Sequence, residues 1–123
     1  MTISYHAREE RKARVEWIEK YVGYGQVIKE MYGCYIGGTI YNGILPQNRQ
    51  AVIFQLTDTG IVFVKAEDNI DFLITLFPCN PKNLLQFYNG NSKKIPSFLK
   101  KKVDRNFSNY KNYKNTHPYI VGL

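Results

Sequence analysis

The spacing of hydrophobic residues changes along this chain of 123 residues. In residues 4–22 the apolar side chains recur three or four positions apart with charged residues between them, which predicts an amphipathic helix. Residues 51–57, 61–66 and 72–77 are instead three runs rich in β-branched and aromatic side chains, which predict strands. Short, turn-rich separators join the three runs, so we expect them to form an antiparallel meander.

Two features extend the prediction for this sheet. The three runs are continuously apolar rather than alternating, so both faces of the sheet should be covered by helices or by another subunit. Residues 33–43 are interrupted by glycines and indicate a further strand or a strand–loop unit. The sheet is therefore expected over about residues 34–77.

Helical signals return after the third strand. Asn80 is placed to cap a helix that has Pro81 at its first position, and Asn89 and Gly90 would end it. Pro96 opens a second helix with two different faces. One face would carry Leu99, Val103, Asn106 and Tyr110, and the other Lys101, Arg105 and Ser108. Residues 109–123, rich in Asn, Lys and Tyr, are expected to be extended.

These elements predict an α+β fold with an N-terminal helix, an antiparallel meander sheet and C-terminal helices. One compact domain over residues 1–123 fits this length, with the helix at 4–22, the sheet at about 34–77, a basic helical region at 81–110 and a tail at 111–123.

The apolar runs are too short to span a membrane and the N-terminus is unlike a signal peptide, so we expect a cytoplasmic protein. Cys34 and Cys79 are predicted to be buried free thiols, and the many aromatic residues favour a homo-oligomer.

The charge pattern is the strongest functional signal. The chain has a net charge of +7, and the stretch from Lys93 to Lys114 contains eight basic residues and one acid, so the rest of the chain is neutral. The basic residues are Lys93, Lys94, Lys100, Lys101, Lys102, Arg105, Lys111 and Lys114. Aromatic residues alternate with these cations, a combination that suits a ligand with phosphate groups and a base.

This pattern predicts a set of ligand-binding residues. Lys101 and Arg105 lie four positions apart on one helix face, so both can reach the same phosphate. A base would stack on Phe77, Phe87 or Tyr110, and the amides of Asn89, Asn91 or Asn106 would add hydrogen bonds. Arg49, just before the first strand of the meander, is a further candidate. A plain solvated basic face is the alternative reading of the charge run.

No catalytic motif is present, and we expect neither a metal nor a cofactor. The two histidines, His6 and His117, are not part of a Cys/His cluster, and there is no nucleophile elbow, phosphate-binding loop or dinucleotide fingerprint. One enzyme class stays open. Residues 6–11 (HAREER) and 74–77 (ITLF) resemble the barnase, colicin and RelE-like toxin group, which implies a metal-independent ribonuclease using His6, Arg11, Arg49 or Thr75.

A second resemblance involves the C-terminal two-fifths of the chain. Residues 72–78 (FLITLFP), 83–90 (NLLQFYNG) and 95–106 (IPSFLKKKVDRN) resemble, in layout, the first family of anti-Thoeris proteins of phages. The resemblance implies a non-enzymatic, homo-oligomeric protein that sequesters a cyclic nucleotide immune signal of the cyclic ADP-ribose type, or in some members cyclic oligonucleotides. The open alternatives are the ribonuclease and a basic regulator that binds nucleic acid.

Overall fold

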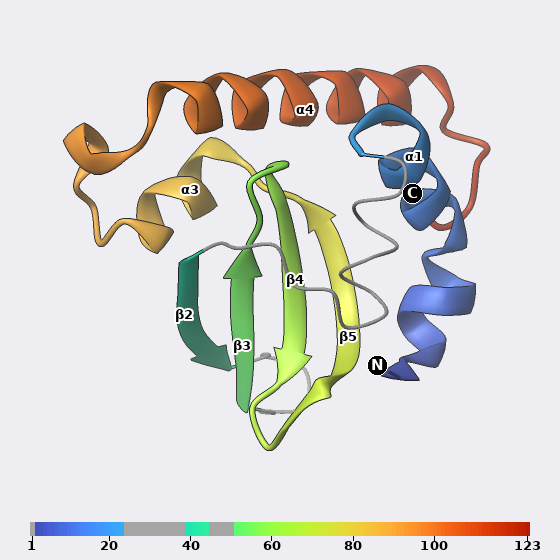
Figure 1. The fold of residues 1–123 in the computed structure, drawn as a ribbon. Helices are drawn as coiled ribbons and strands as arrows, with labels where there is room; N and C mark the ends of the chain where they lie inside the picture. The colour runs from blue at the N-terminus through green and yellow to red at the C-terminus, as the bar shows by residue number, and fades with distance from the viewer. Residues whose placement is uncertain (1, 24–38, 45–50) are drawn as a thin grey trace.

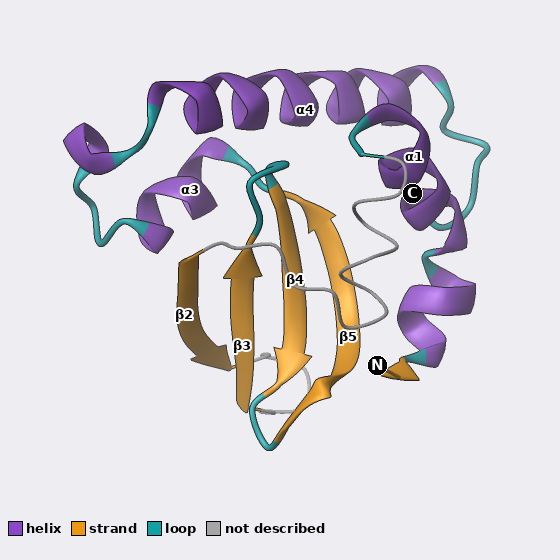
Figure 2. Cartoon of the chain, viewed as in Figure 1, coloured by secondary structure: helices purple, strands orange, loops and turns teal. Residues whose placement is uncertain are grey.

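The fold, taken from a computed structural model, combines a five-stranded sheet with helices at its sides and at one end (Figures 1 and 2). The structure describes residues 2–23, 39–44 and 51–123. It confirms the predicted α+β class. The elements in chain order are β1 (Thr2–Ile3), the π-helical turn η1 (His6–Glu10), α1 (Lys12–Tyr21), β2 (Thr39–Ile44), β3 (Ala51–Leu56), β4 (Ile61–Ala66), β5 (Asn69–Pro78), α3 (Pro81–Phe87), the 3-10 turn η2 (Ser92–Lys94) and α4 (Ser97–Thr116).

The sheet has the strand order β1-β5-β4-β3-β2. Strands β2 to β5 pair antiparallel in sequence, which confirms the predicted meander. Two features differ from the sequence prediction. Strand β5 begins at Asn69 rather than at residue 72. The short strand β1, which the sequence did not predict, pairs with β5 in parallel. Of the further strand predicted at residues 33–43, residues 33–38 lie outside the described part of the chain and residues 39–43 lie in β2.

Both faces of the sheet are buried, as the continuous apolar runs predict. All six residues of β4 are buried, and alternate side chains join two separate hydrophobic clusters. We call these the α1 cluster and the α3 cluster. The α1 cluster contains Ala7, Trp17, Ile18, Ile61, Phe63, Leu73, Leu76, Tyr110 and Leu123. The α3 cluster contains Val52, Leu56, Val62, Val64, Cys79, Leu84, Phe87, Leu99 and Val103.

The predicted N-terminal helix over residues 4–22 is not continuous. The N–H of Arg11 donates to the carbonyl of His6, which closes the π-helical turn, and α1 starts only at Lys12. In a continuous α-helix the N–H of Arg14 would bond to the carbonyl of Glu10. Here it donates to the carbonyl of Gly122 at 2.9 Å, so contact with the C-terminal segment replaces one helical hydrogen bond.

The C-terminal helices begin close to their predicted positions. The side chain of Asn80 accepts a 2.7 Å hydrogen bond from the N–H of Asn83, which is the predicted cap of α3. Helix α4 starts at Ser97, directly after Pro96, and buries Leu99, Val103, Asn106 and Tyr110, the four residues predicted to share a face. The periodicity of the sequence therefore identifies the buried face of α4.

The prediction that residues 109–123 are extended is wrong for the first half of this segment, because α4 continues to Thr116. Aromatic packing explains the difference. The ring of Tyr110 lies 4.9 Å from that of Trp17, and the ring of Tyr113 lies 5.9 Å from that of Tyr21. Tyr110 and Tyr113 lie on the face of the helix that packs on α1. The many Asn and Lys residues in this stretch make that helical spacing hard to recognise in the sequence.

Helix α4 lies across the end of the sheet, from α3 on one side to α1 on the other (Figure 1). The amide Nδ2 of Asn106 donates to the carbonyl of Thr59 at 2.9 Å, so α4 rests on the turn between β3 and β4. Gly60 in that turn has a φ of +83°, and an added Cβ would lie 3.2 Å from Asn106 and 3.4 Å from Val103. This turn therefore sets how closely α4 approaches the strands.

Within the described residues, no helix is long and apolar enough to cross a membrane.

Cys79 is a buried free thiol, as predicted, and Cys34 lies outside the described residues. Burial raises the pKa of the Cys79 thiol from 9.0 to about 12. The folded chain therefore holds this group as a neutral thiol throughout the physiological range.

A Cys34→Ser variant isolates Cys79 for a test of this burial. At pH 8 the folded variant should react with an aromatic disulfide reagent roughly a thousandfold more slowly than the urea-unfolded variant, because thiolate is the reactive form. Between pH 9 and 12 the unfolded thiol ionises while the folded one stays protonated, so the free energy of unfolding should fall as pH rises. Equal reaction rates in the folded and unfolded states would contradict the burial of Cys79.

Candidate functional site

The basic segment forms an unneutralised surface on η2 and α4. Seven of its eight cations are exposed, and Lys102 is half-buried. Where both partners are described residues, ion pairs join His6 to Glu10 and Arg8 to Glu9, and neither involves this segment. The positive charge of α4 is therefore available to an external anion.

The structure places Lys101 and Arg105 together on the exposed side of α4, away from the buried face that includes Val103. Their four-residue spacing brings the two side chains to the same part of the helix surface, as predicted. Neither residue lines any of the hollows described below. A ligand at this pair would contact a convex helix surface.

Asn106 and Tyr110 are used by the fold. Besides the hydrogen bond from Asn106 to Thr59, the hydroxyl of Tyr110 donates to the main-chain carbonyl of Leu123. The same hydroxyl accepts a 3.0 Å hydrogen bond from Nε of Arg14. Both side chains are buried, so they lie on the opposite face of α4 from Lys101 and Arg105. The structure does not bring these four predicted ligands to one surface.

The other predicted ligands are dispersed. Phe87 is 4% exposed within the α3 cluster, so its ring is not open to a base, and the half-buried Phe77 packs against the same cluster. Asn89 is exposed in the turn after α3, with a φ of 54°. The side chain of Asn91 caps η2 by accepting from the N–H of Lys93. Arg49 lies outside the described residues.

A concave basic site is found further along α4, and we call it the α4 hollow. It has a volume of about 270 Å³ and is lined by Phe107, Tyr110, Lys111, Lys114 and Asn115. The other four residues lie three, four, seven and eight positions after Phe107, so all five lie on one side of the helix. Nζ of Lys114 lies 5.3 Å from the centre of the Tyr110 ring, which forms a cation–π contact.

Only Tyr110 of the α4 hollow was among the predicted ligands. Lys111, Lys114 and Phe107 were visible as part of the basic and aromatic segment, but Lys111 and Lys114 lie in the region predicted to be extended. The helical spacing from Phe107 to Asn115 is the signal that would have found the hollow. It becomes informative once α4 is known to continue to Thr116.

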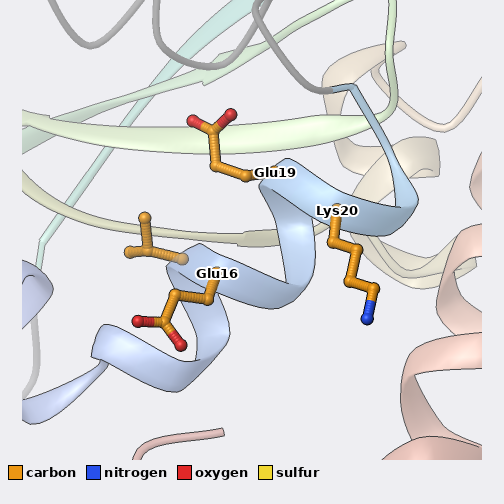
Figure 3. A pocket seen from close by; sticks show the side chains of 4 residues that line it. Glu16, Glu19 and Lys20 are labelled. Atoms are coloured by element: carbon orange, nitrogen blue, oxygen red, sulfur yellow. The ribbon is translucent and has the colours of Figure 1, made fainter.

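A larger hollow, on α1, has a different chemistry. Its volume is about 580 Å³, and its described lining comes from α1: Val15, Glu16, Glu19 and Lys20. Figure 3 shows Glu19 pointing from α1 in a different direction from Glu16 and Lys20. Two carboxylates and one ammonium group do not favour an anionic ligand, so size alone does not identify the phosphate site.

The described residues of the ribonuclease alternative do not converge on one face of the sheet. The two resembling segments are close, because Ser4 Oγ donates to the carbonyl of Ile74 and η1 contacts β5. However, Thr75 pairs in register with Val64, so its side chain lies on the face of the sheet that carries the α3 cluster, where its Oγ1 is buried without a hydrogen-bond partner among the described residues. Ala7, next to His6, belongs to the α1 cluster on the other face. Among the described residues, no group of three His, Cys, Asp or Glu side chains is suited to hold a metal ion.

Comparison with known proteins identifies no relative. No protein-family model, no curated protein and no solved structure matches the chain. The functional argument therefore rests on the residues and the geometry described above.

Proposed function

We propose that this chain binds a small phosphorylated nucleotide at the α4 hollow and holds it without converting it. The biological role we propose is sequestration of a cyclic nucleotide immune signal by a phage protein in the cytoplasm of its bacterial host. The observation that carries the proposal is the convergence of two lysines that are in no ion pair, Lys111 and Lys114, with an aromatic ring and an amide on one hollow.

The chemistry of this lining suits a nucleotide. The ammonium groups of Lys111 and Lys114 donate to phosphate oxygens, and such charged hydrogen bonds contribute ~1.5–3 kcal/mol each. The half-buried ring of Phe107 offers a surface for a base, and base–aromatic stacking contributes ~1–3 kcal/mol. The amide of Asn115 can donate to or accept from a base edge. The ring of Tyr110, only 8% exposed, forms the floor of the hollow.

The size of the hollow supports an oligomeric site. At about 270 Å³ it lies near the lower limit of ~300 Å³ for small-molecule pockets. Exposed rings such as Tyr119, which is 75% exposed, provide apolar surface at the same end of the molecule. We propose that a second copy of the chain completes the enclosure.

Capture of an intact ligand tests the proposed function. The purified chain is incubated with a panel of cyclic nucleotides that includes cyclic ADP-ribose, separated from free ligand and then heat-denatured. Chromatography of the released material should recover at least one member of the panel unchanged. Conversion of the ligand to a product, or absence of capture while RNA is degraded, would contradict sequestration.

Removing the two lysines of the α4 hollow should weaken capture. Each of Lys111→Gln and Lys114→Gln should reduce affinity at least about tenfold, because each removes one charged hydrogen bond. Affinity is measured by isothermal titration with the captured nucleotide. The Lys93→Gln/Lys94→Gln double variant removes two exposed charges on η2 and serves as the control. Equal losses in the control would show that net charge, and not the hollow, governs binding.

Charge reversal at Arg105 separates the α4 hollow from the predicted pair of Lys101 and Arg105. Arg105 and Lys114 are nine positions apart, so at 3.6 residues per turn they project about 180° apart on the helix. One small ligand cannot contact both. Arg105→Glu should therefore change affinity about twofold or less, and a loss that exceeds that of Lys114→Gln would place the site at Lys101 and Arg105.

A second candidate function is supported by the spread of cations around α4. They occupy both sides of the exposed surface of a 20-residue helix, which is about 30 Å long. An extended nucleic acid would use this whole surface. Its affinity would fall steeply with salt, with a slope of about −0.9 per neutralised phosphate on duplex DNA. A slope of about −5 or steeper would favour the regulator over the nucleotide binder.

A further inference from the structure

A second basic hollow lies beside the α4 hollow, where the segment after α4 returns to the start of α1. We call it the tail hollow. It has a volume of about 220 Å³ and shares Lys114 with the α4 hollow. Its lining consists of Arg11, Lys114, His117, Pro118, Ile120, Gly122 and Leu123. Three side chains that can carry positive charge, Arg11, Lys114 and His117, therefore meet here from two parts of the chain, the start of α1 and the end of α4.

Arg11 supplies the first sign that the tail hollow is a ligand site. Its backbone is fixed by two hydrogen bonds, since its N–H donates to the carbonyl of His6 and its carbonyl accepts from the N–H of Val15. The side-chain Nε is buried and has no hydrogen-bond partner among the described residues. A buried donor on a charged group is costly to leave unpaired, so an acceptor that the described part of the chain does not provide is expected at this position.

His117 is held in place at the edge of the same hollow. Its ring stacks on Tyr113 with the ring centres 4.1 Å apart and an interplanar angle of 17°. Nδ1 lies 3.0 Å from the carbonyl oxygen of Tyr113 and 2.9 Å from Oγ1 of Thr116. Nδ1 is thereby engaged by the helix end, and Nε2 is the ring nitrogen that remains for a ligand.

The backbone around the tail hollow also favours an anion. The hollow lies at the N-terminal end of α1, where the helix dipole adds positive potential. Gly122, with a φ of +87°, forms part of the wall without a side chain, and a Cβ added there would lie 2.6 Å from the carbonyl oxygen of Glu10. Glu9 and Glu10, the acidic residues that precede Arg11 in the sequence, have other partners, because Glu10 pairs with His6 and Glu9 with Arg8. No ion pair in the described part of the chain neutralises Arg11.

We infer that Arg11, Lys114 and His117 form a second phosphate subsite that continues the α4 hollow. The inference rests on the proposed function. Lys114 lines both hollows, so one ligand can place a phosphoryl group on Lys111 and Lys114 and a second one on Arg11 and His117. The ligand class this favours is a nucleotide with at least two phosphoryl groups, and a nucleoside monophosphate would occupy only half of the site.

Inorganic phosphate is the probe for this subsite, because it needs neither a base nor Phe107. The full-length, ¹⁵N-labelled chain is titrated with phosphate at constant ionic strength and followed by NMR. The Arg11 Nε–H signal and the ring signals of His117 should shift in a saturable way. His117→Gln and Lys114→Gln should each weaken this binding at least about fivefold, and Lys93→Gln, which removes an exposed cation on η2 that lines neither hollow, should leave it unchanged. Signals of Arg11 and His117 that do not respond, or respond equally in all variants, would overturn the subsite.

A parallel titration with a captured cyclic nucleotide distinguishes the two proposals. If the nucleotide is captured and moves the signals of Phe107 and Lys111 but not those of Arg11 and His117, the subsite is wrong and the proposed function stands. If phosphate binds Arg11 and His117 while no cyclic nucleotide is captured, the subsite stands as an anion site and the proposed function fails. Shifts in both sets of signals with one nucleotide support both proposals.

Discussion

Replacing Phe63 with alanine should lower the free energy of unfolding by about 3–5 kcal/mol, the largest stability effect we expect from a single change in this chain. Phe63 lies in the fully buried strand β4 and is itself 0% exposed within the α1 cluster. Its side chain contributes transfer free energy, and its removal leaves a cavity between the strand and helix α1. Neighbouring strands on both sides limit how far the structure can relax into that space.

Urea denaturation measures this effect, with Phe98→Ala as the matched control. Phe98 is 54% exposed near the start of α4, so its truncation should change stability by about 1 kcal/mol or less. The two variants lose the same atoms and differ in burial. Similar losses of stability in both would show that Phe63 is not packed as the structure describes.

Replacing Gly122 with alanine should detach the C-terminal segment and cost about 2–4 kcal/mol. The new Cβ would lie 2.6 Å from the carbonyl oxygen of Glu10, a main-chain atom that cannot swing aside as a side chain can. The positive φ of +87° adds a penalty of about 1 kcal/mol for a residue with a side chain. Movement of the segment would also break the hydrogen bonds that Arg14 makes with Gly122 and Leu123, at about 0.5–1.5 kcal/mol each.

Gly90→Ala is the control for Gly122, since it separates backbone conformation from steric collision. Gly90 has a φ of +79°, but an added Cβ meets no atom within 4 Å. Its substitution should therefore cost only the conformational penalty of about 1 kcal/mol. Denaturation curves report the difference in stability, and hydrogen exchange of the Arg14 amide reports whether the segment has moved. Retained protection of that amide in Gly122→Ala would contradict the expected detachment.

Helix α4 connects the stability of this chain to its proposed function. Its buried residues Leu99, Val103, Asn106 and Tyr110 fix the helix to both core clusters and to the turn between β3 and β4. Because the buried face is fixed, the exposed cations are held at set positions around the helix. A rigid scaffold of this kind lowers the entropy lost when a ligand binds.

Several features of the fold could be predicted because they depend on local chemistry. The cap at Asn80 requires only an oxygen placed three residues before an N–H, and the short sequence around it provides that geometry. The buried face of α4 follows from the 3.6-residue period, and the strands β3 and β4 from runs of β-branched and aromatic residues. Each of these signals is contained within about ten neighbouring residues.

The candidate site was harder to predict, since its residues change role with their long-range neighbours. Asn106 is predicted as a ligand from its amide and Tyr110 from its aromatic ring. In the fold the amide of Asn106 bonds to Thr59, and the ring of Tyr110 packs on Trp17 while its hydroxyl bonds to Leu123. The ring of Phe87 packs in the α3 cluster, so it too is used by the fold. A sequence shows that a polar or aromatic group is present, and it does not show which distant partner occupies it.

The order of residues alone was enough to establish the α+β class, the meander and the concentration of positive charge near the C-terminus. It did not establish where the positively charged surface forms a hollow. The α4 hollow exists because Tyr110 and Tyr113 pack on α1 and keep α4 helical to Thr116. The tail hollow exists because Gly122 reaches Glu10 and Arg14 across more than a hundred residues of chain. Local propensity acts over a few residues, whereas a binding site needs side chains from distant segments to meet, and only packing of the whole chain brings them together.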